Sequence, residues 1–281
     1  MSRAPSATLR GKELAARLRE LRTGAGLTIA DVAERLLVSP TKISRLETAV
    51  RPASLRDVRD LSAIYGVSAD ERDRLLALAR DSRKRSWWQQ YDLPYDTYVG
   101  LEASAVAILE YRTTIVPALL QTPAYAQAVT EGVLYDSPAE TVAQRVEARL
   151  IRQRLLDADS PPRLWTVVDE AALHREVGGR AVMAEQLAAL ADWAARPNVT
   201  VQVLSHRAGA HPGMDSSFTL LQLEEGVPNF VYVEGLLGDH YLESSVDLTR
   251  YSRVFDHLRA SALGPRDSIS LITELTTQLS A

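Results

Sequence analysis

The most chemically informative residues of the chain lie between positions 39 and 51. A helix is expected over 40–47, because Ser39 is a suitable N-cap and a proline is tolerated at the first helical position. Ile43 and Leu46 would share its inner face. The outer face would then be small, hydroxylic or basic, comprising Pro40, Thr41, Lys42, Ser44 and Arg45. Such side chains can hydrogen-bond to base edges and phosphates, so this helix is suited to the major groove of DNA.

The segments around this helix are expected to hold it in place. Thr28, followed three residues later by Asp31, predicts a variant of the capping box for a preceding short helix, which a tight turn joins to 40–47. Ser54 predicts the start of a fourth helix that ends at Gly66. Ser68 and Glu71 predict a capping box for a fifth helix, reaching about residue 83. With an amphipathic helix over 9–23, these elements predict a compact five-helix DNA-binding domain.

This stretch resembles the Xre or lambda-repressor-like helix-turn-helix family. The matching pattern is 26–28 (GLT), 32–33 (VA), 38–39 (VS), 43–44 (IS), 46–47 (LE) and Pro52. The resemblance implies that Pro40, Thr41, Ser44 and Arg45 contact bases, and that Glu47 forms a structural ion pair with Arg22. The full set of candidate DNA-binding residues is Thr28, Ser39, Pro40, Thr41, Lys42, Ser44, Arg45 and Arg51.

The chain departs from the family pattern at three positions. Ile29 stands where the family often has a glutamine that contacts the phosphate end of the site. Leu37 and Ala49 stand where the family often has glycine. A left-handed backbone conformation at either of these two positions would carry strain, because each has a side chain.

The charge of the chain is divided unevenly along its length. The net charge of the 281 residues is −4, but residues 1–85 contain 18 Lys and Arg against 11 Asp and Glu. The remaining residues contain 14 against 25. The excess of positive charge therefore lies where phosphates would be neutralised.

Composition excludes several classes of protein. The chain has no cysteine, which excludes disulfides, cysteine-ligated zinc and a cysteine nucleophile. No run of about 18 apolar residues predicts a membrane span, and the first residues lack the apolar core of a signal peptide. The expected location is the bacterial cytoplasm, and no membrane association is expected.

Length and aromatic clustering predict two domains with a packed junction. We expect a helix-turn-helix DNA-binding domain at 1–83, an aromatic-rich junction at 84–100 and an α+β regulatory or partner-binding domain at 101–281. The junction aromatics are Trp87, Trp88, Tyr91, Tyr95 and Tyr98. They are consistent with an interdomain seam, a dimer interface or a pocket for a small effector.

The sequence of the larger domain predicts a series of helices followed by strands. Helices are expected at 101–112, 123–134, 138–158, 180–195, 245–261 and 266–279. Strands are expected at 163–169, 199–204, 217–223 and 229–234, where β-branched and aromatic residues are frequent. The predicted fold class is therefore multidomain: an all-α helix-turn-helix domain followed by an α+β domain with a mainly antiparallel sheet.

The same region resembles the C-terminal domain of WhiJ-like, or antitoxin-like, actinobacterial regulators. The landmarks are 116–122 (VPALLQT), 125–126 (YA), Arg149, 152–153 (RQ), 169–173 (DEAAL), 177–179 (VGG), 186–187 (QL), 196–204 (RPNVTVQVL), 209–212 (GAHP), 218–221 (FTLL) and 231–234 (VYVE). The resemblance implies a transcription regulator of development or antibiotic production, with a small acidic BldB-like protein as its partner. It implies no catalytic residue and no ligand.

Polar residues in the predicted loops leave an enzyme or a metal site as alternatives. They are His206, His211, Asp215, Glu234, Asp239 and His240. His206, His211 and Asp215 are suitable ligands for a divalent metal, and His211 is suitable as a general base. Polar residues are also ordinary in Gly- and Pro-rich turns, and no metalloprotease, phosphate-binding or nucleophile-elbow motif occurs. We therefore expect no catalysis, no cofactor and no metal.

Three arginines follow one face of the helix predicted at 138–158. Arg145, Arg149 and Arg152 are spaced at i, i+4 and i+7. They form either a solvated face that pairs with acids such as Glu147, or a docking groove for an acidic partner.

Together these features predict a sequence-specific transcription regulator that acts as a homodimer on double-stranded DNA, with a C-terminal domain that binds a partner or effector. An antitoxin that autoregulates its operon and an enzyme fused to a DNA anchor remain as alternatives.

Overall fold

The computed structural model describes residues 9–83, 86–91, 93–225, 227–235 and 238–281. The start of the chain, which bears on the expectation about a signal peptide, and positions 84, 85 and 92 of the junction lie outside the described residues. The chain divides into two compact units, residues 1–101 and 102–281. Each unit is described by itself below.

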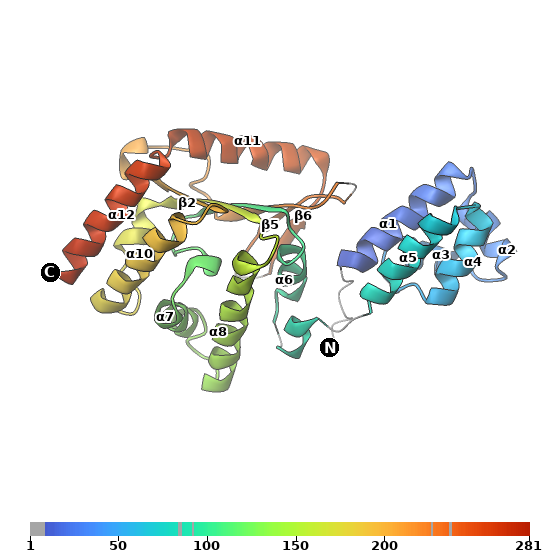
Figure 1. Ribbon diagram of the computed structural model, residues 1–281, viewed down its shortest axis with the longest axis horizontal. Coiled ribbons are helices and arrows are strands. Elements are labelled where there is room, and N and C mark those ends of the chain that lie inside the picture. Colours follow the sequence, from blue (N-terminus) through green and yellow to red (C-terminus); the bar gives the residue numbers. More distant parts are fainter. Residues whose placement is uncertain (1–8, 84–85, 92, 226, 236–237) are drawn as a thin grey trace. The chain divides into compact units, whose positions relative to one another are not determined.

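Residues 9–81 of the N-terminal unit form five α-helices, as the sequence predicts (Figure 1). They are α1 (Leu9–Gly24), α2 (Ile29–Arg35), α3 (Pro40–Glu47), α4 (Leu55–Tyr65) and α5 (Ala69–Asp81). One apolar core joins all five, with Leu18, Val32, Ile43, Leu61 and Leu75 among its buried members.

Hydrogen-bonded caps define where these helices begin. The Thr28–Asp31 box forms in both directions at α2, and Ser39 Oγ accepts from the Lys42 N–H at α3. At α5 only the Ser68 hydroxyl half of the expected box is observed, and the Glu71 carboxylate instead accepts a 2.6 Å bond from Arg17 Nε of α1. The side chain that would complete the cap therefore ties two helices together.

Two non-glycine residues adopt the left-handed conformation that the departures from the family pattern suggested. Leu37 has φ 54° in the turn between α2 and α3, and Ala49 has φ 55° after α3. Each forces a Cβ close to a backbone carbonyl, at a cost of about 1–2 kcal/mol.

The C-terminal unit contains a six-stranded mixed sheet in the order β3-β2-β1-β4-β5-β6. The strands are β1 (Ala107–Arg112), β2 (Arg163–Asp169), β3 (Val199–Leu204), β4 (Phe218–Gln222), β5 (Phe230–Val233) and β6 (His240–Leu242). β1, β2 and β3 are parallel to one another, whereas β4, β5 and β6 pair in antiparallel fashion. The unit is therefore α+β with a mostly antiparallel sheet, as expected.

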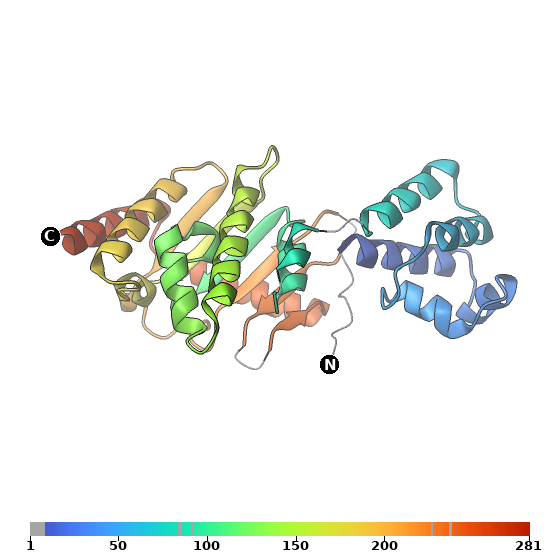
Figure 2. The same cartoon turned by 90° about the horizontal axis from the view of Figure 1, so that it is seen from below.

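Helices cover both faces of this sheet (Figures 1 and 2). α11 (Ser245–Ser261) packs on one face, where Phe255 and Leu258 meet Tyr111, Phe218 and Val231 of the strands. The opposite face carries α7 (Pro123–Val133) and α8 (Ala139–Gln153). The short helix α6 (Asp96–Glu102) lies at the boundary between the two units. α10 (Arg180–Ala194) and α12 (Pro265–Ser280) pack against each other beside edge strand β3. A short helix, α9 (Glu170–His174), begins directly where β2 ends.

The expected helix at 101–112 is wrong. α6 ends at Glu102, and Ala107–Arg112 is instead strand β1, paired to β2 on one side and β4 on the other. Ile108 and Tyr111 are fully buried there. A short apolar run is compatible with a strand or with a buried helix. Here pairing with β2 and β4 favours the strand.

Candidate functional site

The outer face of α3 carries the residues that the sequence selects for DNA. Pro40, Thr41 and Arg45 are exposed, and Ser44 is half-buried. The inner face is closed, because Ile43, Leu46 and Glu47 are buried against the rest of the unit. Thr28 and Ser39, at the starts of α2 and α3, and Arg51 are also exposed. α3 therefore offers its polar side chains from a fixed backbone.

An ion pair anchors the inner face of α3 to α1. Arg22 Nε lies 2.7 Å from Glu47 Oε1, and Arg22 Nη2 lies 3.0 Å from Glu47 Oε2. Arg22 Nη1 also donates to the Leu27 carbonyl at 2.7 Å. The side chains are only 10% and 3% exposed. The hydrogen bond to Glu47 raises the pKa of Arg22 and outweighs the effect of burial. The structure thus brings together the two residues that the family resemblance pairs.

Lys42 differs from the expected free, outward cation. Its ammonium lies 2.7 Å from Asp57 Oδ1, and its side chain is 25% exposed. Asp57 also closes the capping box with Ser54 at the start of α4. Burial raises the pKa of Asp57, but hydrogen bonds from Lys42 and Ser54 hold it below its ordinary value. Lys42 is therefore a link between α3 and α4.

Ile29 also bears on the contact to DNA. Its side chain is partly buried and packs against the apolar core. An aliphatic side chain in that place cannot supply the hydrogen bond that a glutamine would donate to a phosphate.

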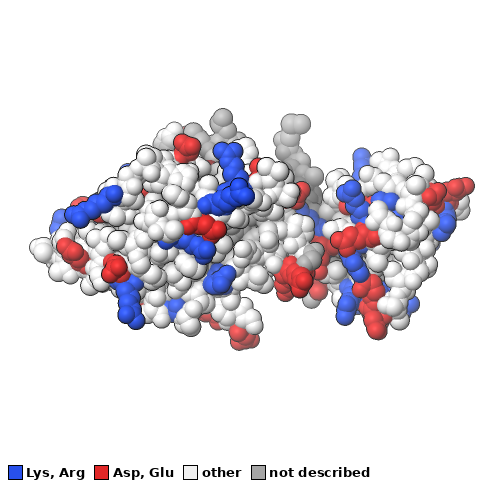
Figure 3. All heavy atoms as spheres, turned by 90° about the horizontal axis from the view of Figure 1, so that it is seen from above, with Lys and Arg blue, Asp and Glu red and all other residues white. Residues whose placement is uncertain are grey.

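Charges of both signs are mixed over the visible face of the N-terminal unit in Figure 3. Several are paired, including Arg10 with Glu13 and Arg17 with both Glu20 and Glu71. Some of the basic side chains that the sequence places in this domain are thus paired within it, while the excess of Lys and Arg over Asp and Glu remains.

The junction aromatics pack among themselves over a short stretch. Trp87 makes edge-to-face contacts with Trp88 and Tyr91, at ring separations of 5.7 and 6.0 Å. Tyr91 and Tyr98 are buried, whereas Trp87, Trp88 and Tyr95 are half-buried. This order suits a packed segment more than a flexible linker.

The arginine row on α8 is not a fully solvated face, because Arg152 is buried and Arg149 is half-buried. Arg152 is buried, and its Nε and Nη2 donate to the two carboxylate oxygens of Glu102, each at 2.7 Å. Arg149 Nη1 donates to Gln121 Oε1, and Arg145 is half-buried. Arg152 and Arg149 thus tie α8 to Glu102 and Gln121, which come from earlier parts of the sequence.

The polar loop residues do not assemble as the sequence suggested. His211 is separated from His206 and instead packs edge-to-face on Tyr111, with its Nε2 3.8 Å from Asp169 Oδ2. Tyr111 donates to the same carboxylate oxygen at 3.1 Å. Burial, followed by the charge of Asp169, raises the pKa of Tyr111, so its hydroxyl stays protonated.

This contact follows from the topology of the sheet. The segment from β3 to β4 must cross the carboxyl ends of β2 and β1, and it brings His211 over Tyr111 and Asp169. Gly213 allows the crossing, since a Cβ there would lie 2.6 Å from the Tyr111 ring. Asp215, Glu234 and His240 are exposed.

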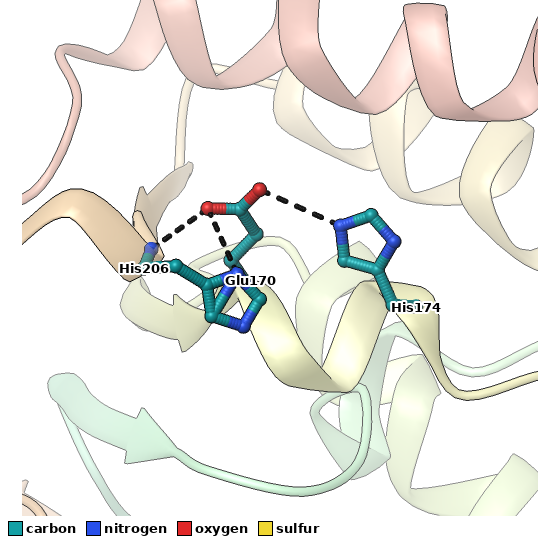
Figure 4. Close-up of side chains that lie close together, drawn as sticks. All are labelled: Glu170, His174 and His206. Atoms are coloured by element: carbon teal, nitrogen blue, oxygen red, sulfur yellow. Dashed lines mark hydrogen bonds and ion pairs between the residues drawn. The ribbon is translucent and has the colours of Figure 1, made fainter.

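His206 lies in a different group, which the sequence did not predict. Glu170 and His174 of α9 meet His206, which follows β3, as Figure 4 shows. Glu170 Oε1 lies 3.4 Å from His174 Nε2, and Glu170 Oε2 lies 3.4 Å from His206 Nδ1. The only signal in the sequence was the i, i+4 spacing of Glu170 and His174 on one helical turn. Within the ranges that the structure describes, no other three His, Asp or Glu ligand atoms approach this closely.

Glu170 is the fixed member of this group. Its Oε2 accepts from Ser205 Oγ and from the His206 N–H, each at 2.8 Å. Burial raises the pKa of Glu170, but these hydrogen bonds, with His174 and His206, leave it below its ordinary value. The carboxylate is therefore ionised at neutral pH.

Across the described ranges no helix is long and apolar enough to cross a membrane.

Comparison with known proteins agrees with this division of the chain. Residues 13–75 match a helix-turn-helix domain, which covers most of α1 to α5. Residues 95–274 match the domain of unknown function DUF5753. No curated protein and no solved structure is significantly similar to the chain. The helix-turn-helix match and the geometry of α3 identify the N-terminal unit as a DNA-binding domain of the kind found in regulators. The DUF5753 match spans more than half of the chain, and the chain therefore belongs to the DUF5753 family.

Proposed function

We propose that this chain is a cytoplasmic, sequence-specific transcription regulator of the Xre type, which reads operator DNA with α3. The observation that carries the proposal is the contrast between the two faces of that helix. Its inner face is fixed by Ile43, Leu46 and the Arg22–Glu47 pair, while Arg45 and Thr41 are exposed. A rigid helix with exposed hydrogen-bonding side chains meets the requirement for reading base edges.

Arg45 has the central role in this proposal. A guanidinium can donate two hydrogen bonds to the major-groove edge of guanine. Thr41 and Ser44 supply shorter hydroxyl contacts, and Arg51 supplies a phosphate contact just beyond the helix. Lys42 is assigned to holding α4 through Asp57, and its contribution to DNA affinity is indirect.

We further propose that the regulator works as a homodimer and that its C-terminal unit binds a partner or effector without catalysing a reaction. One helix-turn-helix unit covers a short half-site, so affinity and specificity together call for two. The resemblance to WhiJ-like regulators supports a small acidic BldB-like protein as the partner. Tyr111 donates a hydrogen bond to Asp169 and His211 packs on the Tyr111 ring, an arrangement that suits a structural role in holding the segment between β3 and β4.

The experiment is selection of bound fragments from genomic DNA of the source organism by the full-length protein. We expect enrichment of an inverted repeat, with half-sites about 10 base pairs apart from centre to centre, upstream of genes. A reporter driven by that region should change its output when the protein is supplied. Failure to enrich any sequence, at low salt as well as at physiological salt, would overturn the proposal.

A further inference from the structure

The group formed by Glu170, His174 and His206 has the chemistry of a metal site. It combines two imidazoles with one carboxylate, and the three ligand atoms all lie within 4.8 Å of one another. His174 and His206 are 49% and 57% exposed, so an ion would reach them from solvent. The DNA-binding role proposed above does not use these residues.

The distances in the group are close to those around a small ion. Two ligand atoms that each lie about 2.0–2.1 Å from a tetrahedral ion are separated by about 3.4 Å. Glu170 Oε1 lies at this distance, 3.4 Å, from His174 Nε2. His206 Nδ1 lies 3.4 Å from the other carboxylate oxygen, Oε2, and would turn toward Oε1 to share the ion. The two imidazole nitrogens would approach each other by small side-chain rotations, which their exposure allows.

The backbone holds the ligands in register before any ion arrives. Asp169 of β2 and Leu204 of β3 are direct partners in the parallel ladder, so the residues that follow each strand are neighbours. The Ser205 hydroxyl and the His206 N–H fix one Glu170 oxygen from β3's side. Outer hydrogen bonds of this kind orient metal-ligating carboxylates in proteins.

We propose that Glu170, His174 and His206 form a binding site for one divalent transition metal ion, with zinc as the preferred ion. Two histidines and one glutamate leave a fourth tetrahedral position open to water or to a ligand. Imidazole nitrogen favours zinc, copper or nickel over magnesium or calcium, which prefer oxygen. A bound ion would join α9 to the segment after β3 and stabilise the C-terminal unit.

The test measures Zn²⁺ binding to the full-length protein after a chelator has removed any bound metal. Calorimetry gives the affinity and stoichiometry, and thermal unfolding gives the change in Tm. The matched variants are His174→Ala/His206→Ala and, as a control, His240→Ala/His257→Ala, which removes two histidines elsewhere. We expect one ion per chain and an increase in Tm for the wild type and the control. The first variant should lose at least tenfold in affinity, and Mg²⁺ should produce no increase in Tm.

Because His174 and His206 are half-exposed, their removal should leave the Tm of the metal-free protein almost unchanged. If the double variant does not fold, His206→Gln is measured in its place. The proposal is overturned if the wild type binds no Zn²⁺. It is equally overturned if the His174/His206 variant binds as tightly as the control, or if Mg²⁺ stabilises the protein as well as Zn²⁺ does.

Discussion

Single residues decide how firmly α3 is held. Arg22 and Glu47 are buried together, and each satisfies the other with two short hydrogen bonds. Removing one partner of such a pair strongly lowers the free energy of unfolding, because the other charge then remains in the interior without a partner. The pair thereby holds α3 against α1.

Glu47→Ala should lower the free energy of unfolding of the N-terminal unit by about 3–5 kcal/mol, since it leaves the Arg22 guanidinium buried alone. The double change Arg22→Met/Glu47→Leu should cost clearly less, because both charges are removed and the volume is kept. Urea unfolding of the two variants compares them. Equal and small effects would show that the pair does not hold the helix.

Leu37→Gly should stabilise the protein. The side chain of Leu37 is 92% exposed, so little packing is lost, and its φ of 54° is relieved. The relief of about 1–2 kcal/mol exceeds the entropy that glycine adds to the unfolded chain, about 0.5–1 kcal/mol. Gly66→Ala is the matched control, since Gly66 has φ 65° in open space and its replacement should destabilise. The same sign for both changes in thermal unfolding would refute this account.

At the scale of elements, the sequence predicts the helix-turn-helix well because its signals are local. Thr28, Ser39 and Ser54 each bond to a backbone N–H within three residues. The same reasoning fails at β1, whose strand conformation depends on β2 and β4, more than 50 residues away along the chain. β6 is three residues long and was not predicted, since so short a strand has no recognisable period.

The candidate sites show the same division between local and distant information. The outward residues of α3 follow from helical spacing alone, with Lys42 as the exception because Asp57 lies on another helix. The group of Glu170, His174 and His206 needs the parallel pairing of β2 and β3, which periodicity does not reveal. His211 and Asp169 likewise meet only because the segment between β3 and β4 crosses the sheet end.

That crossing segment should depend on Gly213. A methyl group there would lie 2.6 Å from the Tyr111 ring and 3.1 Å from Leu258, both buried and unable to yield easily. Gly213→Ala should therefore destabilise the C-terminal unit by about 1–3 kcal/mol. Gly132→Ala on α7 is the control, because its Cβ would meet open space and alanine favours the helix. If thermal unfolding shows no decrease in Tm for Gly213→Ala, the crossing segment can shift away from the Tyr111 ring without loss of stability.

At the scale of the whole molecule, we expect the residues beyond 86 to supply most of the dimer contacts. A fragment of residues 1–85 retains the five-helix core. It should be monomeric in light scattering. It should also bind the selected operator far more weakly than the full chain, because each monomer binds a single half-site without a linked second copy on the other. A full-length protein that remains monomeric both free and on DNA would contradict this expectation.

The most direct measurement of the central claim is a titration of the selected operator with Arg45→Ala. The matched control is Arg74→Ala, an exposed arginine on α5, which packs on α1 and α4. We predict that Arg45→Ala weakens operator binding by about 1–3 kcal/mol and relaxes the preference at one base position in each half-site. Arg74→Ala should bind the operator like the wild type. If Arg45→Ala binds the operator with wild-type affinity and base preference, α3 is not the element that reads DNA.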